Sequence, residues 1–172
     1  MPRPGCAAAH TSLDAVELVE LAVEAALRLE LTTVERLRDI CHDAARNRPG
    51  RAVLQEVLRI RPEGAAPAES YLETRCVQVL RSGGVADFER QVVLQDSCGP
   101  IGRVDLRLGH VVIEVVGWVA HHDKLDPDSY RYARLTAAGF YVLPFTFRQI
   151  EFDPNHIVNA TKAALGGRPG GE

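Results

Sequence analysis

Hydrophobic positions in the first third of the chain recur every three to four residues, which is the period of an amphipathic helix. One such stripe predicts a helix over 13–30 with Ser12 as its N-cap, and Thr33 is a good N-cap for a second helix. Pro49 suits the first turn of a third helix. We expect the three helices to bury their hydrophobic stripes against one another, as an N-terminal segment over 12–64.

After a break rich in Gly, Ala and Pro at 63–67, the pattern of the chain changes. Helical spacing returns over 68–82, and short alternating or continuous hydrophobic runs then indicate strands separated by turns or helices. We expect strands near 91–96, on both sides of a turn at 109–110 and at 140–145, with helices at 127–138 and 154–165.

The order of these elements predicts the topology of the sheet. The first three strands follow one another through short turns and should form an antiparallel meander, whereas a helix joins the third strand to a parallel fourth. Pro144 indicates that the fourth strand ends there or lies at an edge of the sheet. The sequence therefore predicts an α/β fold over 65–165, a mixed four-stranded sheet flanked by helices, with flexible tails at 1–11 and 166–172.

Two carboxylates lie inside the predicted hairpin. Gly109 and His110 suit a two-residue turn of type II′, which prefers glycine first, and this register places Asp105 directly opposite Glu114. Opposed Cβ atoms are about 4.5–5.5 Å apart, so two like charges there repel each other. Mg²⁺ favours sites built from one or two carboxylates with water and phosphate oxygens. The pair therefore predicts metal-dependent chemistry on a phosphodiester.

Neighbouring arginines offer a different explanation for the first carboxylate. Arg103 and Arg107 share a strand face with Asp105, and from spacing alone a cross-strand ion-pair cluster is as well supported as a metal site. Glu114 is harder to explain in this way, because it lies among valines and isoleucine, where an unpaired carboxylate costs several kcal/mol. It needs either a metal or a guanidinium as its partner.

Other side chains that can carry chemistry come from the neighbouring elements. Glu73 lies beside the hydrophobic stripe of the helix at 68–82, where it can reach a metal directly or through water. His121 follows the second carboxylate strand, and an imidazole there can activate water or protonate a leaving group. The arginines expected to contact DNA phosphates, in a salt-sensitive manner, are Arg103, Arg107, Arg131 and Arg148.

Composition narrows the class of protein. The net charge of −3 excludes a global basic field that would draw the chain to nucleic acid, and leaves only a local basic strip. The four cysteines form no Cys-x-x-Cys pair, so we expect neither zinc nor a disulfide framework, and reduced thiols fit a cytoplasmic protein. No hydrophobic run is long enough to span a membrane, and no signal peptide is expected. The oligomeric state stays open.

Taken together, these motifs resemble the Vsr-like endonuclease domains, of actinobacterial type, within the PD-(D/E)XK nuclease superfamily. The resemblance covers about 68–165, and residues 12–62 resemble the helical region that precedes this domain in longer relatives related to antitoxin-associated proteins. Its pieces are Ser70-x-x-Glu73, Arg103-Val-Asp105-Leu, Ile113-Glu114-Val-x-Gly117-Trp, His121, Asp128-x-x-Arg131-x-x-x-Leu135-x-x-x-Gly139-Phe and Val142-Leu-x-Phe-Thr146.

The resemblance implies a restriction-endonuclease-like fold and hydrolysis of DNA that depends on Mg²⁺ or Mn²⁺. It would make Asp105 and Glu114 the metal ligands, Glu73 the helix carboxylate and His121 an accessory acid or base.

Two positions depart from the family's pattern. Val116 stands where the family has Asp and the wider superfamily often has Lys, and Pro144 stands where the family tends to have Arg. Asp105 and Glu114 are both retained, so we expect the metal pair to survive. Neither replacement carries a charge, so we expect catalysis to be weak or absent. One alternative is a non-catalytic nucleic-acid-binding or antitoxin-like regulatory module on the same fold. Another is a structural or oligomerisation role for the acidic helix at 13–30.

Overall fold

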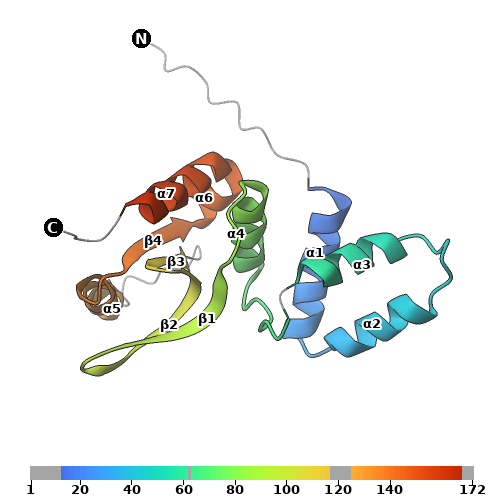
Figure 1. Cartoon of the computed structure of the whole chain (residues 1–172), viewed down its shortest axis with the longest axis horizontal. Coiled ribbons are helices and arrows are strands. Elements are labelled where there is room, and N and C mark those ends of the chain that lie inside the picture. The colour runs from blue at the N-terminus through green and yellow to red at the C-terminus, as the bar shows by residue number, and fades with distance from the viewer. Residues whose placement is uncertain (1–12, 62, 117–124, 168–172) are drawn as a thin grey trace, which may run out of the picture.

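The computed structural model describes residues 13–61, 63–116 and 125–167. Three N-terminal helices precede a mixed sheet that has helices on both faces (Figure 1), so the expected α/β fold is confirmed. The helices are α1 (Ala15–Arg28), α2 (Val34–Asp43), α3 (Arg51–Ile60), α4 (Tyr71–Ser82), α5 (Leu125–Ala137), α6 (Phe147–Phe152) and α7 (Pro154–Gly166). The strands are β1 (Glu89–Asp96), β2 (Gly99–Leu108), β3 (Val111–Val116) and β4 (Tyr141–Thr146).

The sheet has the order β1-β2-β3-β4, with an antiparallel meander followed by a β4 that runs parallel to β3. The tight turn between β2 and β3 is confirmed, because Leu108 faces Val111 and Gly109 has the positive φ, +58°, that a type II′ turn requires. β4 is an edge strand and continues past Pro144 to Thr146, so the edge position is the correct explanation of that proline.

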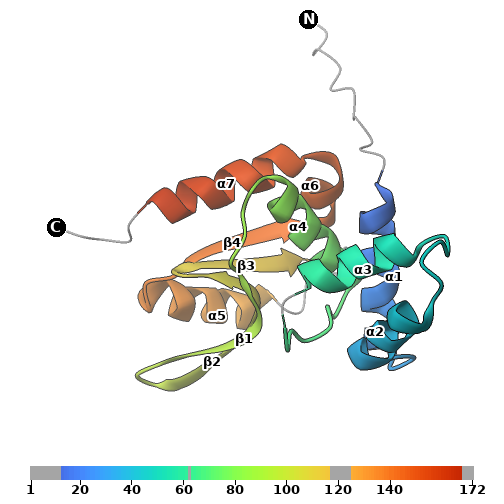
Figure 2. The same cartoon turned by 45° about the vertical axis from the view of Figure 1, so that its right-hand side comes forward.

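Helices cover both faces of the sheet, α4, α6 and α7 on one side and α5 on the other (Figure 2). Leu106, Leu108 and Ile113 pack on the first side, as their alternation predicts. The alternation also places Val104 on that side, and this prediction is wrong, because Val104 packs with Val112 beneath α5. At Val104, β2 still pairs with Val92 of β1 but no longer pairs with β3.

Helix starts differ from the prediction by two residues in two places. Asp14, rather than Ser12, is the N-cap of α1, and it forms a reciprocal capping box with Glu17. The third helix begins after Gly50, which has a φ of +81°, and not at Pro49. The N-cap of α2 is the expected Thr33.

One helix was not expected from the sequence. The pair Thr146 and Gln149 forms a capping box that starts the short helix α6 directly after β4. The sequence contains both residues of this capping box, but the helix starts where β4 ends, with no loop residues between them to mark a new element. Helix α7 also continues to Gly166, one residue into the expected tail. Among the described residues, no helix is long and apolar enough to cross a membrane.

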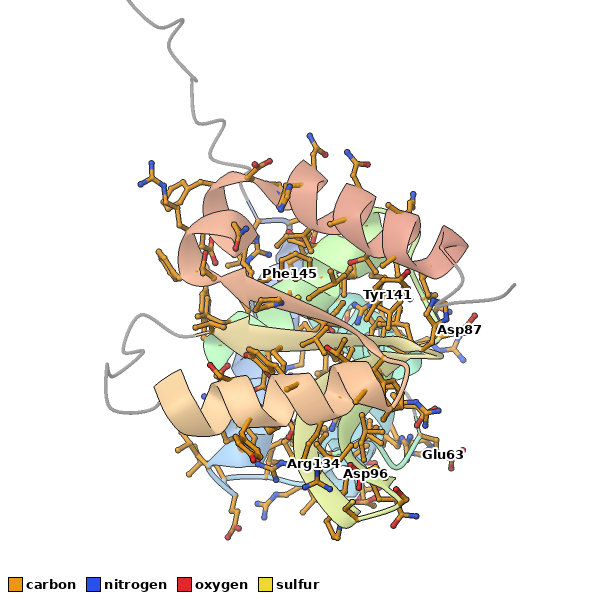
Figure 3. The ribbon with its side chains drawn as sticks, turned by 90° about the vertical axis from the view of Figure 1, so that its left-hand side faces the viewer. Glu63, Asp87, Asp96, Arg134, Tyr141 and Phe145 are labelled. Carbon is orange, nitrogen blue, oxygen red and sulfur yellow. The ribbon has the colours of Figure 1, made fainter. Side chains whose placement is uncertain are left out.

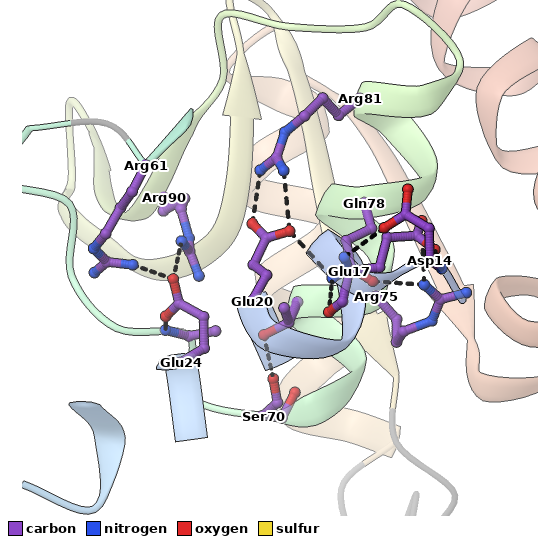
Figure 4. A network of polar contacts seen from close by, with 12 residues as sticks. Asp14, Glu17, Glu20, Glu24, Arg61, Ser70, Arg75, Gln78, Arg81 and Arg90 are labelled. Carbon is purple, nitrogen blue, oxygen red and sulfur yellow. Dashed lines mark hydrogen bonds and ion pairs between the residues drawn. The ribbon is translucent and has the colours of Figure 1, made fainter. Parts of the chain in front are cut away.

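The N-terminal helices bury their hydrophobic stripes together, as expected, in a cluster that includes Val23, Leu27 and Val57. The acidic side of α1 is not solvated, however, because it packs against α4 and β1 through buried ion pairs (Figure 4). Glu20 accepts two hydrogen bonds from the guanidinium of Arg81, at 2.9 and 3.0 Å. The acidic helix therefore attaches the N-terminal segment to the sheet.

Glu24 is the centre of the second buried cluster at this junction. It is only 3% exposed, and its carboxylate pairs with Arg61 and with Arg90, the latter at 3.2 Å. Its other oxygen accepts a hydrogen bond from the backbone N–H of Ala68 at 2.8 Å. One side chain of α1 thus connects the end of α3, the linker and β1.

Candidate active site

The candidate site lies where β2 and β3 separate. The two strands pair regularly from the turn as far as Leu106 and Ile113. One step further, the same register would place Asp105 opposite Glu114. There, the Oδ2 atom of Asp105 accepts a hydrogen bond from the backbone N–H of Val115 at 2.7 Å. The carboxylate takes the place of a strand carbonyl, so it is held in the gap, one residue along β3 from Glu114.

Glu114 is buried, at 6% exposure, and its partner is a guanidinium from α5, the helix that covers this face of β3. Arg131 of α5 donates from Nη1 to the Oε1 atom of Glu114 at 2.6 Å. The same nitrogen donates to the backbone carbonyl of Arg103 at 3.0 Å. The sequence left either a metal or a guanidinium as the partner of this carboxylate, and the structure shows a guanidinium.

Glu73 comes from the first turn of α4, whose N-cap is Ser70. It is 7% exposed, and its Oε2 atom accepts hydrogen bonds from the backbone N–H of Glu69, at 2.9 Å, and from the Nε2 of Gln91, at 2.7 Å. Two hydrogen bonds to one oxygen thus fix the carboxylate of Glu73 close to the gap.

Gln91 is a residue of this site that the sequence analysis missed. It has a φ of +54°, a left-handed conformation that costs a non-glycine residue free energy and that often marks functional positions. Its amide holds Glu73, whereas the preceding Arg90 pairs with Glu24 of α1. The sequence contains no signal for it beyond one polar side chain in an alternating strand.

Burial dominates the electrostatics of the two carboxylates that face the gap. It raises the pKa of Asp105, against the opposing effects of the Val115 N–H and the charge of Arg131. Burial also raises the pKa of Glu73, and the negative charge of Asp105 adds to this rise. At both positions the nearby positive charge does not offset the effect of burial, so the charged carboxylate is disfavoured. A cation bound beside these groups would favour their charged forms.

The cross-strand cluster of arginines around Asp105 does not form among the described residues. Arg103 pairs with Glu69, and Arg107 lies 3.7 Å from Glu89 and donates to a carbonyl of the turn. Arg103 lowers the pKa of Asp105 only through its charge at longer range. Arg131, from α5, acts on both carboxylates of the hairpin instead.

The remaining predicted site residues lie on β3, β4 and α6 or outside the described residues. Arg148 is exposed on α6, directly after β4. Val116 is half-buried at the end of β3, and Pro144 is exposed on β4 beside Glu114. His121 lies outside the described residues.

The donors present can be compared with the needs of a metal ion. Within 13–61, 63–116 and 125–167, no three His, Cys, Asp or Glu side chains gather closely enough to hold one. The described candidates are therefore the two hard oxygen donors Asp105 and Glu114, a set that Mg²⁺ binds together with water and phosphate oxygens. The oxygen donors of the pair and the partial burial of Asp105 fit a divalent cation. In the structure, the position beside Glu114 is occupied by the guanidinium of Arg131.

Comparison of the chain with protein-family models, with curated proteins and with solved structures gives no match.

We expect Asp105→Asn to raise the melting temperature near neutral pH. In the folded chain the pKa of Asp105 lies above its ordinary value, so the charged form costs stability, and this cost grows as the pH rises through the folded pKa. The amide keeps an oxygen for the Val115 N–H and removes the charge. The gain should be a few degrees, at about 2–4 °C per kcal/mol, and should shrink as the pH falls toward the ordinary value of 3.8.

Thermal melts across this pH range measure the effect, with Asp39→Asn at an exposed position of α2 as the control. A melting temperature that falls in Asp105→Asn by the same amount at every pH would contradict the prediction.

Proposed function

We propose that this protein binds DNA and hydrolyses its phosphodiester bonds with a divalent cation, Mg²⁺ or Mn²⁺. The observation that carries the proposal is the position of Asp105. This half-buried carboxylate is held in the gap between two strands by the N–H of Val115, the neighbour of Glu114, and it is close enough to Glu73 to perturb its pKa. The order of the nuclease-like motifs along the chain supports it.

In this proposal, Asp105 and Glu114 would hold the cation, and the chemistry that it would supply when bound is Lewis-acid stabilisation of the phosphate and activation of water. The N–H of Val115 orients the carboxylate of Asp105, and Gln91 fixes Glu73 beside it. Arg103, Arg107, Arg131 and Arg148 are the proposed phosphate contacts, so DNA binding should weaken as the salt concentration rises.

The alternative is a module on the same fold that binds nucleic acid without cleaving it. Two observations favour this alternative. Val116 places a hydrocarbon side chain two residues from Glu114, where the resembled family has a charge. Arg131 already neutralises Glu114 without a metal.

A nicking assay on supercoiled DNA with Mg²⁺ or Mn²⁺ separates the two. If the protein is a nuclease, Asp105→Ala should lower the cleavage rate by at least about 100-fold, equivalent to about 2.7 kcal/mol of lost transition-state stabilisation. Asp39→Ala, an exposed aspartate of α2, should cleave like the wild type.

Cleavage that is equal in the wild type and Asp105→Ala would reject this site as its source. A wild type that binds DNA and Mn²⁺ but does not cleave would support the non-catalytic alternative.

A further inference from the structure

The ion pair between Arg131 and Glu114 joins two side chains of different freedom. The side chain of Glu114 is 8% exposed and belongs to a central strand, whereas that of Arg131 is 23% exposed and stands on a long stem from α5. A carboxylate on a short side chain in a paired strand has little room to move. The guanidinium is therefore the partner that can leave.

The backbone of β2 makes room for the arginine stem. Gly102 has a φ of +144°, and a Cβ there would lie 3.2 Å from the Cδ of Arg131. The guanidinium then passes the carbonyl of Arg103 and lies over the ring of Tyr132, 5.4 Å from its centroid. These contacts guide Arg131 to the same gap that holds Asp105, where its charge lowers the pKa of that carboxylate.

We propose that Arg131 is a tethered cation that holds Glu114 until a DNA phosphate draws its guanidinium away, so that a divalent cation and DNA bind together. The proposal rests on the proposed function, because it takes Asp105 and Glu114 as the metal ligands. A guanidinium and a divalent ion repel each other beside one buried carboxylate. A phosphate offers the guanidinium an equally good, bidentate partner.

Two consequences follow from this exchange. Without DNA, the apparent metal affinity is reduced by the fraction of molecules in which Arg131 has left Glu114. With DNA, the metal affinity rises, and by linkage the metal raises the DNA affinity by the same factor.

Calorimetric titration of Mn²⁺ into the full chain tests the proposal in the wild type, Arg131→Met and Arg134→Met. Methionine keeps an unbranched stem and removes the charge. Arg134 is the matched control, because it lies one turn further along α5 and pairs with Asp96 at 2.7 Å (Figure 3), away from the carboxylates of the gap. Its substitution removes a similar ion pair from the same helix.

We expect Arg131→Met to bind Mn²⁺ about 10–100-fold more tightly than the wild type, which corresponds to a pair that is closed in about 90–99% of molecules. Arg134→Met should bind like the wild type. A short DNA duplex supplies phosphate oxygens to the ion in every variant, but it should raise the Mn²⁺ affinity of the wild type by a larger factor than that of Arg131→Met.

Equal Mn²⁺ affinities in all three proteins, raised by DNA to the same extent in each, would overturn the tethered cation and leave the metal site standing. No Mn²⁺ binding in any of them would overturn both proposals. Because Arg131→Met leaves Glu114 without this partner, melting curves accompany the titrations, and Mn²⁺ should stabilise this variant more than the wild type. If it does not fold, Arg131→Gln takes its place, because its amide is neutral and still offers a donor in that direction; affinity no tighter than the wild type would then overturn the proposal.

Discussion

Replacing Glu24 by glutamine is expected to lower the free energy of unfolding by about 3–5 kcal/mol, because the change leaves buried positive charge without its partner. Glu24 is the shared carboxylate of Arg61 and Arg90, whose side chains are only 6% and 7% exposed. Burial lowers the pKa of Arg61, and the charge of Glu24 opposes that shift. Such a loss is a large part of the 5–15 kcal/mol that typically stabilises a domain.

Urea unfolding curves of the wild type, Glu24→Gln and Glu63→Gln measure this effect. Glu63 is an exposed glutamate in the segment between α3 and α4, so its substitution changes the net charge equally without breaking the buried cluster. Glu24→Gln and Glu63→Gln unfolding at the same urea concentration would show that the cluster contributes little to stability.

Val116→Asp is expected to tighten Mn²⁺ binding by at least about tenfold, equivalent to about 1.4 kcal/mol. Residues two apart in a strand share a face, so position 116 lies on the same face of β3 as Glu114. A third carboxylate there increases the negative charge that attracts the ion. Without metal, the added charge should lower the melting temperature, and Mn²⁺ should restore it.

Calorimetry and melting curves with and without Mn²⁺ test this prediction, with Val93→Asp as the control. Val93 is 63% exposed on β1, so the same substitution there adds a charge to a strand away from the gap. If the proposed function holds, Val116→Asp should also raise the rate of DNA cleavage. An unchanged Mn²⁺ affinity in Val116→Asp would mean that this position does not face the ion.

Most elements of the fold could be predicted from the sequence because their signals are local. Hydrophobic periodicity separates helices from strands, Gly109 permits the tight turn, and Ser70 and Thr33 cap the helices that they precede. A helix between β3 and β4 also predicts that these two strands run parallel, because parallel neighbours need a long crossover connection. These features depend on residues within a few positions of one another.

The sequence by itself determined the element order apart from α6, the sheet topology, and the hairpin register from the turn as far as Leu106 opposite Ile113. Only the tertiary structure decided which cation accompanies each carboxylate: Arg131 at Glu114, Arg103 at Glu69 rather than at Asp105, and Arg61 with Arg90 at Glu24. The physical reason is that periodicity reports the local backbone and one buried face. The partner of a buried charge depends instead on how elements far apart in the chain pack together, and an arginine's position in the sequence does not specify that packing.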